Sequence, residues 1–159
     1  MLFRSLNAAI DAVKEVRKRL SITLLVFSGP FMDDVNYKRL RAKRSARILV
    51  KRFAPDFLDI LAASDLSVSM AGYNTCMNIL AAETKGLVWP FSQNREQRFR
   101  VQKLSKTGRL ILLNEKDLEP ERLAVRIYET LLHYKPSTVK IDLQGSKKTA
   151  RILEKASET

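Results

Sequence analysis

Residues 65–100 read DLSVSMAGYNTCMNILAAETKGLVWPFSQNREQRFR, and this stretch determines the fold of the chain. Leu66–Ser69 is short, alternates apolar with polar side chains and predicts a β-strand. The apolar spacing that begins at Asn74–Thr75 predicts a helix, and Gly86 is its predicted end. Leu87–Trp89 predicts a second apolar strand, which Pro90 stops because proline has no N–H to donate. The stretch therefore indicates a strand, a tight turn, a helix and a second strand.

The polar residues that follow these two strands predict a binding site. A polar loop after the second strand leads into another helix, so Gly72–Thr75 and Gln93–Gln97 are expected side by side at the carboxyl ends of parallel strands. Open α/β sheets bind their ligands at that edge. A phosphate is favoured there by three features: the free amides at the helix start, the helix dipole, and a glycine that permits close approach. The turn alone leaves the alternative open that Asn74 or Thr75 only caps the helix.

The order of several motifs resembles a known family. Ser69–Thr75 reads SMAGYNT, and Pro90, then Glu96-Gln97-x-x-Arg100, then Gly108 follow it. This pattern is similar to the donor half of family 28-type glycosyltransferases. These are two-domain (GT-B) enzymes that include the one adding N-acetylglucosamine to lipid-linked peptidoglycan precursors. The likeness runs from about residue 28 to residue 123. It implies that the chain binds a nucleotide sugar, with a uridine diphosphate (UDP) sugar as the expected donor of a hexose or N-acetylhexosamine.

The resemblance also implies roles for particular residues. The diphosphate would lie at Gly72, Tyr73, Asn74 and Thr75, the uracil base at Phe53 and Ala54, and the sugar hydroxyls at Gln93, Glu96 and Gln97. Asn78 stands where family members usually have a glutamate that binds the ribose; its amide can still hydrogen-bond a diol but lacks the charge. The resemblance implies no metal ion, because helix dipoles stabilise the leaving diphosphate, and no other cofactor is expected. It assigns no catalytic residue within this chain.

The rest of the chain predicts a single α/β domain over residues 1–159. Hydrophobic periodicity divides it into a helix within 1–20, an α/β core over 21–134 and a C-terminal helix at 146–156. Within the core, strands are predicted at 22–27, 47–53, 66–69, 87–89 and 109–113, and helices at 34–45, 56–63, 74–86, 95–108 and 119–134. Right-handed crossovers would join these into a Rossmann-like parallel sheet of about five strands with helices on both faces.

One strand of the family pattern is not evident. Donor domains of this family begin with a strand and a glycine-rich loop before their first helix, whereas this chain starts at that helix. The absent strand would lie between the strands at Ile22 and Leu66, so both would face a gap. Because unpaired strand edges attract other chains, we expect self-association. The resemblance also implies that transfer needs an acceptor domain or subunit that is separate or missing, so the isolated chain is expected to be inactive.

The net charge of +12 is concentrated in the N-terminal third. Residues 1–52 hold 13 Lys/Arg and 4 Asp/Glu, which is 13 − 4 = +9, and 38–52 contain eight cations with no acid. Such a surface could steer a nucleotide or contact acidic lipid headgroups, although a solvated helix face on a basic protein is the more ordinary interpretation. Aromatic residues are not interleaved with the cations, which argues against nucleic acid as the partner.

Single residues and apolar runs narrow the function further. The longest apolar run, Ile22–Phe27, is too short to span a bilayer and no signal-peptide pattern is present, so a cytoplasmic location with peripheral membrane contact is expected. Cys76 is the only cysteine and is expected to be a buried, inert thiol. His133 is expected at a helix end or on the surface. No cluster of metal ligands is visible.

Two other functions remain open from the sequence. The chain could be a non-catalytic relic or regulatory module that binds anionic partners through its basic N-terminal third. A sugar-nucleotide epimerase would need catalytic acids and a histidine at its cleft, and neither is evident. Selective diphosphate binding that Thr75→Ala weakens separates the glycosyltransferase reading from the anion-binding module, whose binding would be salt-sensitive and indifferent to that change.

Overall fold

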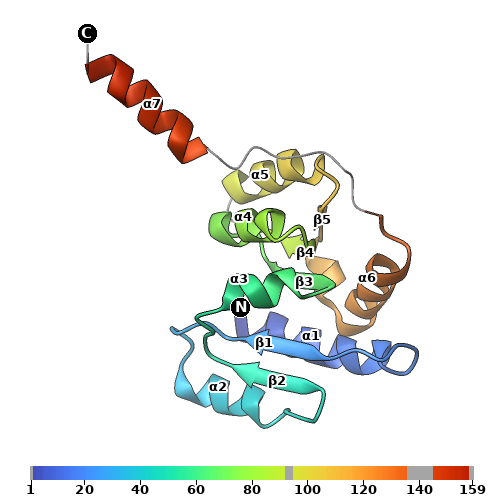
Figure 1. The fold of residues 1–159 in the computed structure, drawn as a ribbon. Coiled ribbons are helices and arrows are strands. Elements are labelled where there is room, and N and C mark those ends of the chain that lie inside the picture. The colour runs from blue at the N-terminus through green and yellow to red at the C-terminus, as the bar shows by residue number, and fades with distance from the viewer. Residues whose placement is uncertain (1, 92–94, 136–144, 158–159) are drawn as a thin grey trace.

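The computed structural model describes residues 2–91, 95–135 and 145–157 (Figure 1). Helices and strands alternate along most of this range, as the sequence predicts. In chain order the elements are α1 (Leu2–Val16), β1 (Leu24–Phe27), α2 (Asp34–Arg41), β2 (Ile48–Lys51), α3 (Phe57–Ala62), β3 (Leu66–Met70), α4 (Tyr73–Ala81), β4 (Lys85–Trp89), α5 (Arg95–Ser105), β5 (Leu110–Leu112), the 3₁₀-helix η1 (Glu115–Leu118), α6 (Pro120–Leu132) and α7 (Gly145–Ser157).

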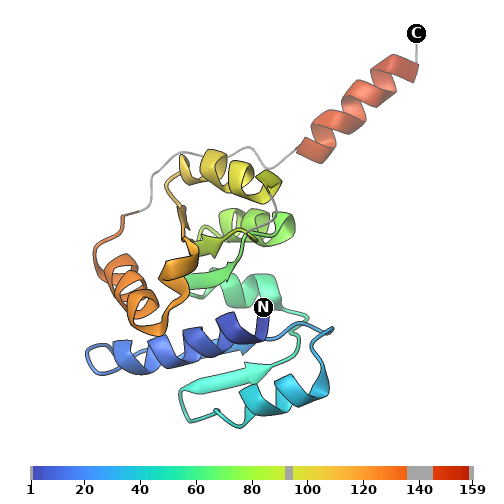
Figure 2. The same ribbon diagram turned by 180° about the vertical axis from the view of Figure 1, so that it is seen from behind.

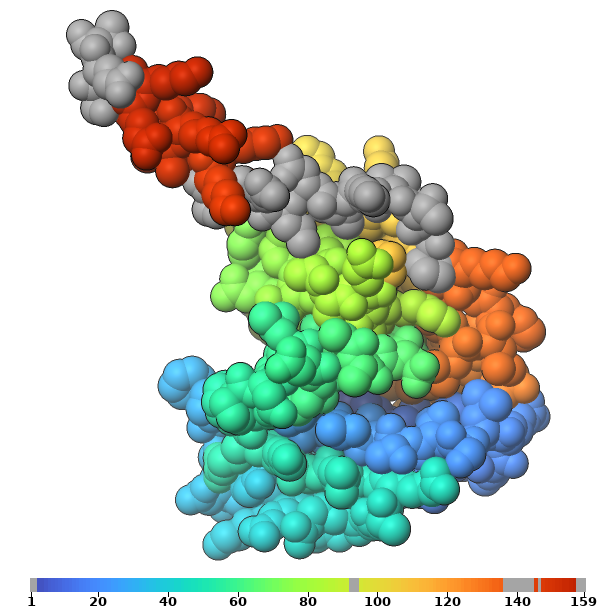
Figure 3. All heavy atoms as spheres, in the orientation of Figure 1, coloured from blue at the N-terminus to red at the C-terminus, as the bar shows by residue number. Residues whose placement is uncertain are grey.

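The described strands form two parallel sheets. β1 pairs with β2, with Leu24 opposite Ile48, and the larger sheet has the order β3-β4-β5. The predicted Rossmann-like α/β fold is confirmed, with its parallel strands divided between two sheets of two and three strands. The division falls between β1 and β3, where the family pattern predicts a gap. In Figure 3 the blue atoms of β1 lie along the green atoms of α3 and β3.

Helices cover both faces of the strands. α1 and α6 pack on each other and lie on one face, in front of the strands in Figure 2. α3, α4 and α5 cover the other face of the larger sheet. β4 is the most buried strand, with only Lys85 partly exposed. The buried residues of the core around α1, α6 and the larger sheet are Ala12, Val13, Val16, Leu87, Trp89, Leu113, Leu123, Ala124 and Ile127.

An ion pair links α1 to the segment after α2. The Lys43 ammonium lies 3.3 Å from the Asp11 carboxylate, and Lys14 donates to the same carboxylate at 2.8 Å. Partial burial alone raises the pKa of Asp11. The hydrogen bond from Lys14 and the charge of Lys43 outweigh that effect, so the net pKa of Asp11 lies below its ordinary value. The carboxylate is therefore better stabilised in the folded chain than in the unfolded one.

Gly86 does not end a helix, which corrects the prediction for that residue. α4 ends at Ala81 and the chain turns at Glu83, whose φ of 57° is in the left-handed region. Gly86 instead lies inside β4. A Cβ atom on Gly86 would stand 2.8 Å from Leu110 Cδ2 and 3.0 Å from Ile79 Cγ2, so the glycine is needed for close packing between the sheet and α4.

The 3₁₀-helix η1 differs from the sequence prediction, and helix α7 lies apart from the α/β core. η1 is not predicted by apolar spacing, and it forms because Asn114 and Asp117 make a reciprocal capping box. The described side chains of α7 are exposed, and the helix projects away from the α/β core in Figure 1. That residues 1–159 act as one nucleotide-sugar-binding domain stays a prediction.

Candidate functional site

The turn from β3 to α4 presents free backbone donors. Gly72 is the residue that precedes the helix, and its own N–H donates to the Met70 carbonyl at 2.8 Å. The first helical bond runs from Cys76 N–H to the Gly72 carbonyl at 3.0 Å. The N–H groups of residues 73–75 therefore have no hydrogen-bond partner among the described residues, and no side chain caps the helix. Together with the helix dipole they favour an anion.

Gly72 has no structural need to be glycine. Its φ of −64° and ψ of 148° are ordinary for any residue. A Cβ atom there would meet only Thr75 Oγ1, at 3.6 Å, which is an ordinary contact. The missing side chain leaves space beside the free amides and the Thr75 hydroxyl. That space is what a phosphate oxygen would need in order to reach the backbone.

An arginine in the middle of α5 contacts the first residue of α4. The Arg100 guanidinium carbon lies 5.1 Å from the centre of the Tyr73 ring, and the same guanidinium forms an ion pair with Glu96 one turn earlier in α5. The arginine thus joins the residues expected for the diphosphate to those expected for the sugar. Its positive charge also adds to an anion-binding environment at this edge.

The residues expected to contact the sugar differ in their surroundings. Gln97 Oε1 accepts a hydrogen bond at 2.9 Å from the Phe91 N–H, so this side chain holds the loop after β4. Glu96 is exposed, and its carboxylate faces Arg100. Gln93 lies outside the described residues.

The residues expected to contact the nucleoside lie on two different parts of the fold. Asn78 is half-buried on α4, one turn after Asn74, and its side-chain amide has no partner among the described residues. Phe53 is 67% exposed and Ala54 is buried. Both follow β2, which belongs to the smaller sheet, whereas Gly72 follows β3 in the larger one. The exposed ring of Phe53 is available for stacking.

A scan against protein families matches residues 2–155 to the model described as the glycosyltransferase family 28 C-terminal domain. The chain belongs to this family. The family 28 C-terminal domain is the nucleotide-sugar-binding half of a glycosyltransferase, which agrees with the free amides and the open Cα of Gly72 at the β3–α4 turn. No curated protein matches the chain.

Other groups in this family 28 domain bear on its chemistry. Cys76 is fully buried, and burial raises the pKa of its thiol, with the charge of Arg100 opposing the shift. His133 is exposed at the C-terminal end of α6, as predicted. In the described part of the chain, no group of three or more His, Cys, Asp and Glu could hold a metal ion. No helix of residues 2–91, 95–135 and 145–157 is long and apolar enough to cross a bilayer.

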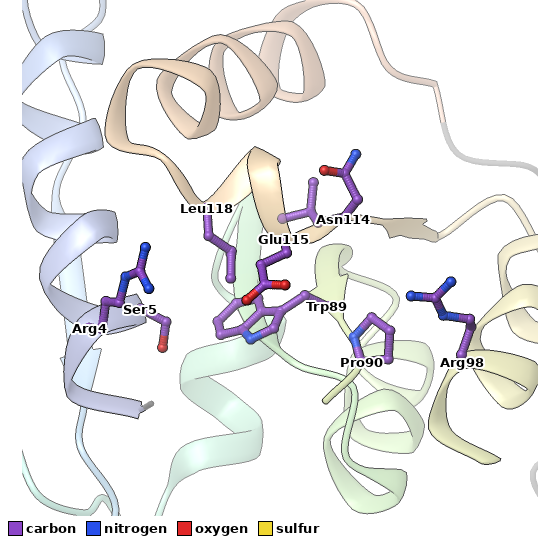
Figure 4. Close-up of a pocket in the computed structure, with 9 residues that line it drawn as sticks. Arg4, Ser5, Trp89, Pro90, Arg98, Asn114, Glu115 and Leu118 are labelled. Atoms are coloured by element: carbon purple, nitrogen blue, oxygen red, sulfur yellow. The ribbon is translucent and has the colours of Figure 1, made fainter. Parts of the chain in front are cut away.

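Sequence reasoning missed a pocket of the domain. A pocket of about 100 Å³, here called the Trp89 pocket, lies where β4 and β5 end (Figure 4). No linear motif joins its residues, which come from four separate elements and loops. The Trp89-Pro90 pair and the Asn114 cap are the signals that could have pointed to it. Its lining residues are Arg4, Ser5, Trp89, Pro90, Arg98, Leu113, Asn114, Glu115 and Leu118.

Proposed function

We propose that this domain binds the diphosphate of a UDP-sugar at the β3–α4 turn and presents the sugar for transfer. The observation that carries the proposal is the set of three unpaired amides at residues 73–75 beside a glycine with no packing or backbone requirement. Such amides would stabilise the negative charge that develops on the leaving diphosphate. The transferred group would be a hexose or an N-acetylhexosamine.

The remaining contacts in the proposal surround this turn. Glu96 and Gln97, with Gln93 before them, would bind sugar hydroxyls, and Asn78 would hydrogen-bond the ribose. The ion pair between Glu96 and Arg100 supports a role in orientation, since it fixes the carboxylate near Tyr73. Phe53 would stack on the base.

The proposal includes a separate acceptor-binding domain or subunit. Transfer needs a general base next to the acceptor hydroxyl, and the residues assigned above bind the donor without such a role. The acceptor partner would supply the base and close the site against water. We therefore expect the chain alone to bind donor without transferring sugar.

Calorimetry with UDP, GDP and a short DNA duplex tests the proposal. We expect UDP to bind about tenfold more tightly than GDP, and Gly72→Ala and Thr75→Ala each to weaken UDP binding about tenfold. Gly145→Ala is the matched control, because a Cβ atom there meets nothing within 4 Å. Wild-type affinity for UDP in both Gly72→Ala and Thr75→Ala would remove the proposal.

The alternative function rests on the basic segment around α2. Lys38, Arg39, Arg41 and Arg44 are exposed and form no ion pair among the described residues. A module that binds an anionic partner there would bind DNA or acidic vesicles with an affinity that falls steeply with salt. That binding would be unaffected by Thr75→Ala and weakened by Arg39→Gln, the reverse of the pattern expected for UDP.

A further inference from the structure

Positively charged side chains surround a pocket at the amino ends of β1 and β2, here called the Arg47 pocket. It encloses about 310 Å³ and is formed by the loop that joins α1 to β1 and by the residue that precedes β2. The loop lies at the lower right of Figure 1. This pocket shares no residue with the Trp89 pocket. Its lining residues are Arg17, Lys18, Arg19, Leu20, Ser21 and Arg47, so four of the six are cations and none is an acid.

Backbone and side-chain contacts bring the cations of the Arg47 pocket together. The Leu24 N–H donates to the Arg47 carbonyl at 2.9 Å, so the start of β2 is fixed beside the end of the loop. Arg47 Nη1 donates to Ser21 Oγ at 2.9 Å. The Arg19 guanidinium carbon lies 5.7 Å from the centre of the Tyr128 ring of α6. Two of the four cations are thus held in position before any ligand binds, which lowers the entropy cost of binding.

The charges of the Arg47 pocket are only partly balanced by the protein. Lys18 pairs with Glu15 at 2.6 Å, whereas Arg17 and Arg47 form no ion pair within the described part of the chain. Four cations and one glutamate leave 4 − 1 = +3. The carboxyl end of α1 adds the equivalent of about −0.5 charge, which explains one cation after the helix but not four. The remaining surplus of about +2.5 favours an anion that carries two charges or more.

A phosphate group fits both the donors and the size of the pocket. Guanidinium groups bind phosphate oxygens through two parallel hydrogen bonds, and the Arg17 and Arg47 side chains are exposed and so within reach of one. The Ser21 N–H forms no hydrogen bond with the described residues and is a further donor. Ligand pockets begin at about 300 Å³. A pocket of about 310 Å³ therefore holds a phosphate group with a small part of the molecule that carries it.

We propose that the Arg47 pocket binds a phosphomonoester group of a ligand other than the sugar nucleotide. Arg17 and Arg47 bind the phosphate oxygens, the Ser21 N–H donates to the same group, and Lys18 and Arg19 add positive charge. The pocket precedes β1 and β2, whereas the proposed donor turn follows β3, so the two sites share no residue. A phosphomonoester of this kind occurs on soluble metabolites and on the headgroup of phosphatidate.

Nuclear magnetic resonance of the isotope-labelled chain tests this site, because each backbone amide reports its own surroundings. The intact chain is titrated with inorganic phosphate while sodium chloride keeps the ionic strength constant. We expect saturable shifts of the Ser21 and Arg47 amides. Arg17→Gln and Arg47→Gln should each weaken this binding about tenfold, the loss expected for one charge-assisted hydrogen bond.

A matched variant and a second set of amides separate this site from general electrostatics and from the donor site. Arg39→Gln makes the same charge change at an exposed position of α2 and should leave the phosphate affinity unchanged. The site is overturned by shifts that do not saturate, or by equal losses in Arg39→Gln and Arg47→Gln. Shifts confined to the amides of residues 73–75 would also overturn it and leave the donor site intact. Saturable shifts at Ser21 without any binding of UDP would remove the donor site alone.

Vesicle sedimentation distinguishes the two sources of the phosphate. Phosphatidylcholine vesicles that contain phosphatidate are compared with vesicles in which phosphatidylserine gives the same surface charge. Preferential capture by phosphatidate that Arg47→Gln abolishes and Arg39→Gln retains assigns the site to a lipid headgroup. Saturable phosphate binding in solution without such a preference assigns it to a soluble phosphomonoester. The absence of both results overturns the proposal.

Discussion

Two glycines in neighbouring elements have opposite reasons for being glycine. Gly86 is packed so tightly between Leu110 and Ile79 that a methyl group would overlap both. Gly72 has an ordinary backbone conformation and open space at its Cα. One glycine therefore serves folding, and the other is free to serve a ligand. The contrast gives a way to separate stability from function with the same substitution.

Gly86→Ala should destabilise the domain by about 1–3 kcal/mol, because β4 and α4 must move apart to admit the methyl group. Gly72→Ala should leave stability unchanged or raise it by up to about 1 kcal/mol, since it only restricts the unfolded chain. Urea denaturation followed by circular dichroism measures both. Equal losses in the two variants would show that Gly72 has a packing role after all.

Cys76 should be unreactive in the folded domain. Its side chain is fully buried and burial raises the pKa of the thiol, so the reactive thiolate is scarce at neutral pH and beyond reach of reagents. A chromogenic disulfide reagent at pH 8 should modify Cys76 only when urea is added. Rapid modification of the native chain would contradict the buried position.

The sequence predicts the strand, turn and helix around Gly72 correctly, but it does not predict contacts between residues that are distant along the chain. Gly72–Thr75 follows a strand and opens a helix as expected, because local propensity and turn chemistry agree there. Gly86 is misassigned because its packing depends on Leu110, a residue of another strand that local patterns cannot reveal. The Trp89 pocket is missed for the same reason, since Arg4 and Glu115 meet only in the folded chain.

Helix α1 packs against both sheets, and its Asp11 forms an ion pair that helps to hold the smaller sheet in place. Its carboxylate pairs with Lys43 beyond α2, and its lowered pKa means that the stabilisation is present above the ordinary carboxyl range. The stabilisation is lost as pH falls through the lowered pKa of the folded state. The ion pair therefore contributes at neutral pH and disappears in acid.

Asp11→Asn should reduce stability by about 0.5 kcal/mol at pH 7, the size usual for a partly exposed ion pair. The difference between wild type and variant should shrink as pH falls below the ordinary carboxyl pKa and vanish in strong acid. Urea midpoints at several pH values measure it. A difference that is independent of pH would assign the effect to helix packing rather than to charge.

Element positions are more predictable than element ends. β3, β4 and the starts of α4 and α6 follow from apolar spacing and proline, whereas α1 ends at Val16 and α2 at Arg41, both earlier than predicted. Helix ends fray or tighten according to tertiary contacts, so spacing alone cannot locate them. η1 is too short for any periodicity, and only the Asn114–Asp117 capping box signals it.

The gap between the two sheets is the main feature of the whole molecule. Leu24 and Ser28 donate their N–H groups toward β2, so alternation along the strand turns the N–H groups of Leu25 and Phe27 toward the gap. Leu25 is also 39% exposed. Such an edge can accept a strand from another chain.

We expect the purified chain to self-associate in a concentration-dependent way through this edge. Leu25→Lys should shift the equilibrium toward monomer, because a charged side chain on an open edge opposes pairing. Size-exclusion chromatography with light scattering reads the mass directly. Lys38→Gln, which alters charge on α2 away from the edge, is the control. A wild-type chain that stays monomeric at high concentration would contradict the expectation.

Because the strands are divided between two sheets, the smaller sheet should be able to open without the larger one. No strand hydrogen bonds join β1 and β2 to the larger sheet in the described part of the chain, so this lobe depends on helix contacts and side-chain packing. Parts of a protein that share few bonds open separately. Backbone amides of β1 and β2 should therefore exchange with deuterium through partial opening, whereas those of the buried β4 should exchange only when the entire chain unfolds.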